Sequence, residues 1–324
     1  MKEDFVNELK QPIYDFSRIH NACVNRDGFI FCLGDIPAVY DQLIIRHPAD
    51  AKVWSPQPDI SSRSLEEHIQ LINKYQLEKV TVICNNLSFI LRCPSIKQLS
   101  VHPSDDAGEN FDYSPLYQMP NLCEVSLTMS CGEFDEHWYS VDYTKINGLA
   151  SISAYGKGHN GYEVVPTLEE LRLSNSKKHI NLENISSSPI LKKLELTQCN
   201  TQTLDGVGAY PQLKTMGLYY NRSLWDISAL ADVAGTLKQL YIEACPKIKD
   251  FSVLSSLVNL EYLQLYGSNS LPNLDFLQHM QKLKVFAFSM NVEDGDLSRC
   301  MTLPYATCKN RRHYNLKDSQ LPKR

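Results

Sequence analysis

Apolar side chains recur along most of this chain with one spacing. The unit reads L-x-x-L-x-L-x-x-(N/C/S), and Val, Ile, Met, Phe or Ala can replace leucine at the apolar positions. Alternation of apolar and polar residues in its centre predicts a short β-strand with one buried face. The ten units begin at Leu77, Ile96, Leu122, Leu149, Leu168, Leu191, Leu213, Leu237, Leu260 and Leu283. Successive units start 19 to 27 residues apart.

The length of the repeat predicts how neighbouring units stack. One strand per unit, paired in parallel with the next, would align the inward leucines into a continuous core. The eighth residue after the first leucine is Asn, Cys or Ser in nine of the ten units, and Lys157 is the exception. Such side chains can hydrogen-bond the turn backbone of an adjacent unit. Little room remains for a long helix, so we expect 3₁₀ or single-turn helices between strands.

These repeats resemble the leucine-rich repeat family, in particular its bacterial, internalin-like members with short repeats. The stretches 221–230 and 245–251 carry the likeness most clearly, and the resemblance covers residues 77–308. It implies an α/β solenoid with a curved parallel sheet on the concave face and short 3₁₀ or α turns on the convex face. It also implies that the concave face binds a partner, usually a protein.

The two ends of the chain depart from the repeat. Residues 1–76 are expected to form an α/β N-terminal capping segment over the open end of the solenoid, or a separate partner-binding segment. Within them, Phe29–Phe31 predicts a strand, and a capping box at Ser64–Glu67 predicts a helix. Residues 309–324 hold six Lys or Arg and one Asp, which predicts a basic C-terminal tail or cap, with docking to an acidic partner as the alternative.

Composition narrows the class of protein. The 324 residues are 43% hydrophobic, which is typical of a soluble protein with a large core. A net charge of -5 argues against general binding to nucleic acid or to an anionic membrane. The ten cysteines form no C-x-x-C pair and show no zinc spacing. Because no signal-peptide segment is evident, we expect reduced thiols and a cytoplasmic location, although internalin-like relatives are usually exported.

No motif in the sequence indicates catalysis. The segment Gly156–Gly161 matches G-x-G-x-x-G, but Glu163–Pro166 follows where a dinucleotide site needs a helix. We interpret it as a flexible turn of the imperfect repeat at Leu149. The nine histidines lack metal-ligand spacing, so we expect no metal, no cofactor and no enzymatic activity. A Cys131–His137 pair is the remaining catalytic alternative, because such pairs need only proximity in space.

The alternation of the strands assigns side chains to the concave face. The second, fourth and sixth residues after the first leucine point outward, and tyrosines gather there in the seventh to ninth units. Tyrosine is common at binding sites, but it also stacks well across neighbouring strands. The candidate partner-binding residues are Tyr219, Tyr220, Tyr241, Glu243, Tyr262, Gln264 and Tyr266. The secondary candidates are Tyr155, Arg172, Glu195 and Trp138, and the charges of Arg172 and Glu195 are expected to pair internally.

Two insertions, near 103–120 and 129–148, combine acidic and aromatic residues. If the insertions are exposed, their acidic and aromatic side chains suit the binding of a basic partner surface. Alternatively, each insertion packs on itself. Their acidic residues are Asp105, Asp106, Glu109, Asp112, Glu133, Asp135, Glu136 and Asp142. Their aromatic residues are Phe111, Tyr113, Phe134, Trp138, Tyr139 and Tyr143.

The sequence as a whole predicts a protein-protein interaction module without catalytic activity. The concave face would bind the protein partner, and the acidic insertions are the second candidate surface. A more specific alternative is a cytosolic immunity or inhibitor protein that neutralises a toxin or an enzyme. The remaining alternative is an enzyme with its site in the inserted loops.

Overall fold

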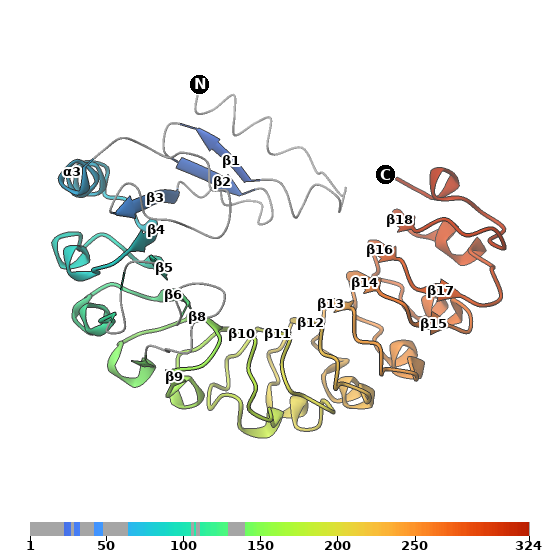
Figure 1. Cartoon of the computed structure of the whole chain (residues 1–324). Coiled ribbons are helices and arrows are strands. Elements are labelled where there is room, and N and C mark those ends of the chain that lie inside the picture. Colours follow the sequence, from blue (N-terminus) through green and yellow to red (C-terminus); the bar gives the residue numbers. More distant parts are fainter. Residues whose placement is uncertain are drawn as a thin grey trace. The chain divides into compact units, whose positions relative to one another are not determined.

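A computed structural model describes residues 23–26, 29–32, 42–47, 64–104, 107, 111–128 and 140–323. The chain divides into two compact units, Met1–Tyr162 and Glu163–Arg324. Each unit is a stack of leucine-rich repeats in which the strand of one repeat pairs with the strand of the next (Figure 1).

The first unit contains α3 (Leu65–Tyr75) and a sheet. The capping box predicted for this helix is present, because Ser64 Oγ accepts from Glu67 N and the Glu67 carboxylate accepts from Ser64 N at 2.7 Å. The strands of this sheet are β1 (Cys23–Arg26), β2 (Phe29–Cys32), β3 (Gln42–His47), β4 (Lys79–Cys84), β5 (Gln98–Pro103), β6 (Glu124–Thr128) and β8 (Ser151–Tyr155). A separate pair is β7 (Val141–Asp142) with β9 (His159–Asn160). The 3₁₀ helices are η1 (Ser88–Arg92), η2 (Ser114–Gln118) and η3 (Tyr143–Lys145), and η4 spans Tyr162–Val164.

A parallel strand precedes the first unit that the sequence pattern identified. Strands β1, β2 and β3 pair antiparallel in that order, whereas β3 pairs in parallel with β4. Leu43 lies opposite Val80 and Ile45 lies opposite Val82, and both valines are fully buried. The backbone of β3 therefore continues the geometry of the repeats.

The second unit is an uninterrupted series of parallel strands. They are β10 (Glu170–Ser174), β11 (Lys193–Thr197), β12 (Thr215–Tyr219), β13 (Gln239–Glu243), β14 (Tyr262–Tyr266), β16 (Val285–Phe288) and β18 (Tyr305–Cys308). Equivalent residues face one another, so that Leu194 lies opposite Met216, and Met216 opposite Leu240. All three are fully buried, which confirms the predicted inward positions. A short pair, β15 (Ser270–Leu271) and β17 (Asn291–Val292), lies beside the series.

Short 3₁₀ helices connect the strands of the second unit, as the repeat length predicts. Most of them bury Leu or Val side chains, for example Leu230 and Leu254. The helices are η5 (Leu182–Asn184), η6 (Val207–Ala209), η7 (Ser228–Val233), η8 (Ser252–Ser256), η9 (Asp275–His279), η10 (Ser298–Thr302) and η11 (Asp318–Gln320).

The residue after each of four consecutive strands has a left-handed backbone. Their φ values lie between 52° and 57°, and each donates its N–H to the carbonyl of the last residue of the next strand. The bonds are Asn175 N to Thr197 O, Gln198 N to Tyr219 O, Tyr220 N to Glu243 O and Ala244 N to Tyr266 O. The chain therefore leaves the sheet at the same angle in each repeat.

Buried polar side chains link successive repeats just beyond this turn. Asn221 is completely buried; its Nδ2 donates to Leu196 O at 2.8 Å and its Oδ1 accepts from Cys199 N at 2.8 Å. The thiols at equivalent positions do the same more weakly, with Cys199 Sγ 3.3 Å from Leu173 O. Cys245 Sγ lies 3.6 Å from Leu218 O. This is the predicted hydrogen bonding between adjacent units.

The ninth unit departs from that prediction. Ser268 is exposed, and Asn269, one residue later, is buried and donates from Nδ2 to Ile248 O at 2.7 Å and to Cys245 O at 3.1 Å. The turn before it differs because Gly267 has a φ of 149° where the preceding repeats have a left-handed residue. The altered turn moves the inward position by one residue.

Residues 309–323 pack against the last strands. Tyr314 is buried, and its hydroxyl donates to Met290 O at 3.2 Å while accepting from Val292 N at 3.0 Å. The Asp318 carboxylate accepts from Cys308 N at 2.9 Å and Leu321 is buried. These contacts cover the end of the strand series at β18.

The insertions of the first unit differ from the exposed acidic loops that we considered, wherever the structure describes them. Phe111, Tyr113 and Tyr143 are buried, and the Tyr113 hydroxyl donates to the Thr128 carbonyl. Asp112 and Asp142 begin 3₁₀ helices by accepting from backbone N–H groups two residues later. The prediction of exposed aromatic side chains is therefore wrong for these three residues, because their rings are buried. The other insertion residues named above, with Cys131 and His137, lie outside the described residues.

Candidate binding surface

Three half-buried tyrosine rings stand together on the outward strand face of the second unit. The ring centroids of Tyr219 and Tyr241 are 6.4 Å apart, and those of Tyr241 and Tyr262 are 4.7 Å apart. In register, Tyr219 lies opposite Glu243 and Tyr241 lies opposite Gln264. The rings therefore follow a diagonal across β12, β13 and β14, two residues back per strand. We call Tyr219, Tyr241 and Tyr262 the tyrosine row.

A glycine makes room for the first ring of the row. A Cβ on Gly217 would stand 2.6 Å from Cε2 of Tyr219 and 2.8 Å from Cγ of Glu195. Gly217 lies between Glu195 and Tyr241 in the sheet register. The missing side chain therefore allows the Tyr219 ring to lie along its own strand, between a carboxylate and the next ring. Sequence reasoning attached no role to Gly217.

The phenol groups of Tyr219 and Tyr262 stay protonated. Burial is the main cause that raises the pKa of Tyr219 and of Tyr262. The carboxylate of Glu195 raises the pKa of Tyr219 further. Tyr219 and Tyr262 thus offer aromatic faces and neutral hydroxyl groups, which suit the binding of a partner.

A network of charges borders the row on β10 and β11. Arg172 contacts Glu170 at 2.5 Å and Glu195 at 3.0 Å, while Lys193 Nζ lies 3.1 Å from Glu195. The structure thus places the predicted internal pairing of Arg172 with Glu195 next to the tyrosines. Both side chains are less than a third exposed, so the network is firmer than an ordinary surface ion pair.

Two further candidates lie at the edge of this face. Tyr220 is 45% exposed, and its hydroxyl donates to Glu243 Oε1 at 2.7 Å. Tyr220 has a left-handed backbone directly after β12, so its side chain projects beyond the end of the strand. Tyr266 is partly exposed and lies at the end of β14, opposite Glu243.

One candidate is wrong as an accessible site residue. Gln264 is only 3% exposed, although its position in β14 predicts an outward side chain. Its neighbours on the same face are Tyr262 and Tyr266 in its own strand and Tyr241 opposite, all of which carry longer side chains. These rings shield the shorter amide, which therefore belongs to the support of the surface.

Of the secondary candidates, Arg172 and Glu195 border the row, as described above. Tyr155 is 45% exposed at the end of β8 and belongs to the first unit. Trp138 lies outside the described residues.

The last strand shows how this face holds a cation. Tyr305 lies opposite Val285, and Val285 lies opposite Tyr262. Lys323 Nζ stands 5.0 Å from the centroid of the Tyr305 ring and 3.0 Å from the Asp318 carboxylate. The Tyr305 ring, the Asp318 carboxylate and the Ala306 carbonyl, at 2.7 Å, thus hold this ammonium group together.

The glycine-rich segment of the first unit is an ordered structural element. His159 on β9 is buried; its Nδ1 accepts from the Tyr143 hydroxyl at 2.7 Å, and its Nε2 donates to Tyr155 O at 3.1 Å. Burial lowers the pKa of His159 to about 4, so the imidazole is neutral. The segment is therefore anchored, which differs from the flexible turn expected. In the described part of the chain, no three His, Cys, Asp or Glu side chains are grouped to bind a metal.

This histidine makes the stability of the protein depend on pH. The unfolded chain takes up a proton on His159 near pH 6.5, whereas the folded chain resists it until about pH 4. Acid therefore favours unfolding, and the stabilisation present above pH 6.5 is lost as the pH falls toward 4. We expect His159 alone to lower the free energy of unfolding by about 2 kcal/mol between pH 7.5 and pH 5. Urea unfolding at a series of pH values measures it.

Two variants control that experiment. His159→Gln should reduce the pH dependence, and part of it should remain because burial also lowers the pKa of His102. Replacing the exposed His179 by Gln should leave the wild-type dependence. Equal pH dependence in wild type and His159→Gln would contradict the assignment.

Comparisons with known proteins concern the fold. An internalin of Listeria monocytogenes aligns over 73% of this chain and 69% of its own, with a TM-score of 0.46 and 15% identity. A Leptospira interrogans leucine-rich repeat protein aligns over 76% and 81%, with a TM-score of 0.35 and 12% identity. The functional domain of InlJ from Listeria monocytogenes, which includes a cysteine ladder, aligns over 79% and 53%, with a TM-score of 0.38 and 14% identity. No protein-family model and no curated protein sequence matches the chain. The leucine-rich repeat fold rests on the parallel strands and buried leucines described above.

Proposed function

We propose that this chain is a protein-binding module without catalytic activity, and that the tyrosine row is the centre of its binding surface. The observation that carries the proposal is the contact of three half-exposed tyrosine rings on one strand face. Tyrosines give a large contact area at a low cost in side-chain entropy, and their hydroxyls orient a partner. No helix in the described residues is long and apolar enough to cross a membrane.

The chemistry around the row favours a basic side chain of the partner at its centre. Glu243 lies opposite Tyr219 and forms no ion pair among the described residues. The Glu195 carboxylate beside Tyr219, by contrast, is already paired with Arg172 and Lys193. The packing of Lys323 on Tyr305 is an example of the same combination within this unit. We infer that a lysine or arginine of the partner lies over the rings, where cation–π contact and a nearby carboxylate both stabilise it.

We also propose that the protein acts in the reducing cytosol. The seven cysteines with described side chains are all free thiols. Burial raises the pKa of Cys84 and of Cys300 to about 12, which suppresses thiolate formation. These thiols thus serve packing, and their chemistry supports neither a structural disulfide nor a nucleophile at these positions.

The experiment compares partners captured by wild type and by Tyr241→Ala/Tyr262→Ala from a lysate of the source cell, using quantitative mass spectrometry. A specific partner should bind the variant at least tenfold more weakly, because two adjacent central aromatic contacts are lost. Tyr155→Ala is the matched control, since it removes an exposed tyrosine of the other unit. Urea unfolding must first show that both variants fold. A partner retained equally by all three proteins would exclude the tyrosine row.

A further inference from the structure

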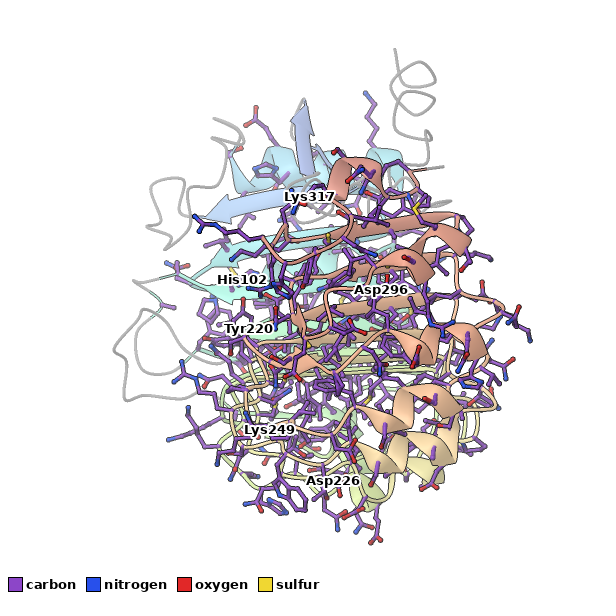
Figure 2. The ribbon with its side chains drawn as sticks, turned by 90° about the vertical axis from the view of Figure 1, so that its right-hand side faces the viewer. His102, Tyr220, Asp226, Lys249, Asp296 and Lys317 are labelled. Atoms are coloured by element: carbon purple, nitrogen blue, oxygen red, sulfur yellow. The ribbon has the colours of Figure 1, made fainter. Side chains whose placement is uncertain are left out.

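A second exposed surface lies on the flank of the second unit, where the chain leaves the strands. Its cations are Lys177, Lys178, Arg222, Lys247 and Lys249. All five side chains are exposed, and Trp225 among them is 53% exposed. We call these six residues the cationic flank. Figure 2 shows Lys249 on the same side of the ribbon as Tyr220, the residue that turns the chain out of β12.

The repeat places these residues in a row. In one repeat Leu224 and Ile227 are buried on either side of Trp225, and in the next Ile248 and Phe251 are buried on either side of Lys249. Trp225 and Lys249 therefore occupy equivalent positions in consecutive repeats. The series continues in the other direction, because Trp225 N donates to Gln202 O at 2.9 Å.

The bridge between His179 and Asn200 joins the preceding repeat, which carries Lys177 and Lys178, to this series. The flank thus spans four consecutive repeats, of which the one after β11 contributes no cation, at a strand spacing of about 4.8 Å per repeat.

The charges of the flank are not neutralised. None of its five cations forms an ion pair or hydrogen bond with another residue in the described part of the chain. At the other end of the strands, by contrast, Lys192 pairs with Glu169 at 2.7 Å, and Glu261 pairs with both Lys238 and Lys284. The sequence places cations at both ends of the strands and provides carboxylate partners at one end.

The acids nearest in sequence have other partners. Asp226 Oδ1 accepts from Ser228 N at 2.8 Å, and Asp250 Oδ1 accepts from Ser252 N at 2.8 Å. Each carboxylate is thereby bonded to the first residue of a 3₁₀ helix, η7 or η8. The flank therefore presents unpaired positive charge around an exposed indole, which supplies attraction and an apolar anchor together.

We propose that the cationic flank is a second docking surface, separate from the tyrosine row, and that its ligand is a short acidic segment of a protein. The positive charge of the flank selects a negative ligand, and Trp225 selects one with an apolar residue among its acids. The whole chain carries a net charge of -5. An extended polyanion or a membrane surface would also contact the rest of the protein, whose net negative charge repels it. A short acidic segment contacts the flank alone.

The test uses a fluorescein-labelled acidic peptide in which one phenylalanine stands between two runs of four glutamates. Fluorescence anisotropy at 0.15 M salt measures its binding. The full chain should bind it saturably and should not bind the same peptide with every glutamate replaced by glutamine. Lys247→Glu/Lys249→Glu should weaken binding at least tenfold. Trp225→Ala should weaken it about threefold, because one partly exposed aromatic contact is lost.

A control variant separates local from general electrostatics. Lys214→Glu/Lys282→Glu changes the net charge equally at exposed positions outside the flank, and should stay within twofold of wild type. Tyr241→Ala/Tyr262→Ala should also bind the peptide normally. Loss of binding in either would overturn the proposal, because the peptide would then respond to total charge or lie on the tyrosine row.

Other outcomes also overturn it. Absence of binding to the acidic peptide would exclude a short acidic protein segment as the ligand. Tighter flank-dependent binding of a 20-nucleotide thymidine oligonucleotide, or of vesicles containing phosphatidylserine, would replace a protein ligand by nucleic acid or membrane. These results leave the function proposed for the tyrosine row unchanged, because its variants are measured separately.

Discussion

Asn221→Ala is expected to lower the free energy of unfolding of the second unit by about 3 to 4 kcal/mol. The side chain is fully buried and satisfies two backbone groups of the preceding repeat, the carbonyl of Leu196 and the N–H of Cys199. Alanine would leave both groups buried without a partner and would also open a small cavity. Each unsatisfied group costs about 1 to 3 kcal/mol. Urea unfolding followed by circular dichroism measures the change.

Ser268→Ala is the matched control for Asn221→Ala. By the spacing of the repeat Ser268 is equivalent to Asn221, but its side chain is exposed. We expect a change within about 0.5 kcal/mol, as for ordinary surface substitutions. A similar loss in both variants, or a loss below about 1 kcal/mol for Asn221→Ala, would contradict the buried hydrogen bonds as the cause.

Gly206→Ala should destabilise the protein by about 3 kcal/mol or more. Gly206 has a φ of 90°, a conformation that side chains oppose. In addition, a Cβ there would stand 2.4 Å from both the backbone N and Cγ of Glu183, in the preceding repeat. The Glu183 N–H is bonded to Asn181 Oδ1 at 2.9 Å, so moving this backbone would break the start of η5.

Gly235→Ala separates steric conflict from the general effect of removing a glycine. Nothing lies within 4 Å of a Cβ at Gly235, and its φ is not positive. We expect no loss of stability, or a gain of up to about 1 kcal/mol from a less flexible unfolded chain. Thermal and urea unfolding of both variants and of wild type measure these changes in stability. Equal stability of Gly206→Ala and wild type would mean that the repeats can separate without cost.

The sequence predicts the strands of this fold well because their period is strict. A shift by one residue would turn every leucine outward, so the buried positions Leu171, Leu194 and Leu240 follow directly from spacing. The prediction fails where a turn changes. Gly267 moves the inward position from Ser268 to Asn269, and a single glycine among many gives no warning of it.

The binding surface was harder to predict because it depends on neighbours across strands. Alternation identifies Tyr241 and Gln264 equally as outward residues, yet one forms part of a row of rings and the other is covered by them. The gap at Gly217 and the absence of partners for Lys249 among the described residues likewise depend on side chains from other repeats. The spacing of one repeat carries no information about these contacts.

The buried thiols of the repeats have a practical consequence for kinetics. Cys199 and Cys245 occupy equivalent inward positions in repeats two apart, and burial raises the pKa of Cys245 to about 11. A thiol reagent can therefore reach either sulfur only when its own repeat opens. The alkylation rates of Cys199 and Cys245, measured by mass analysis of their peptides, would report the rate at which each repeat opens locally. The molecule thus carries its own probes for whether the repeats of the second unit open together or one at a time.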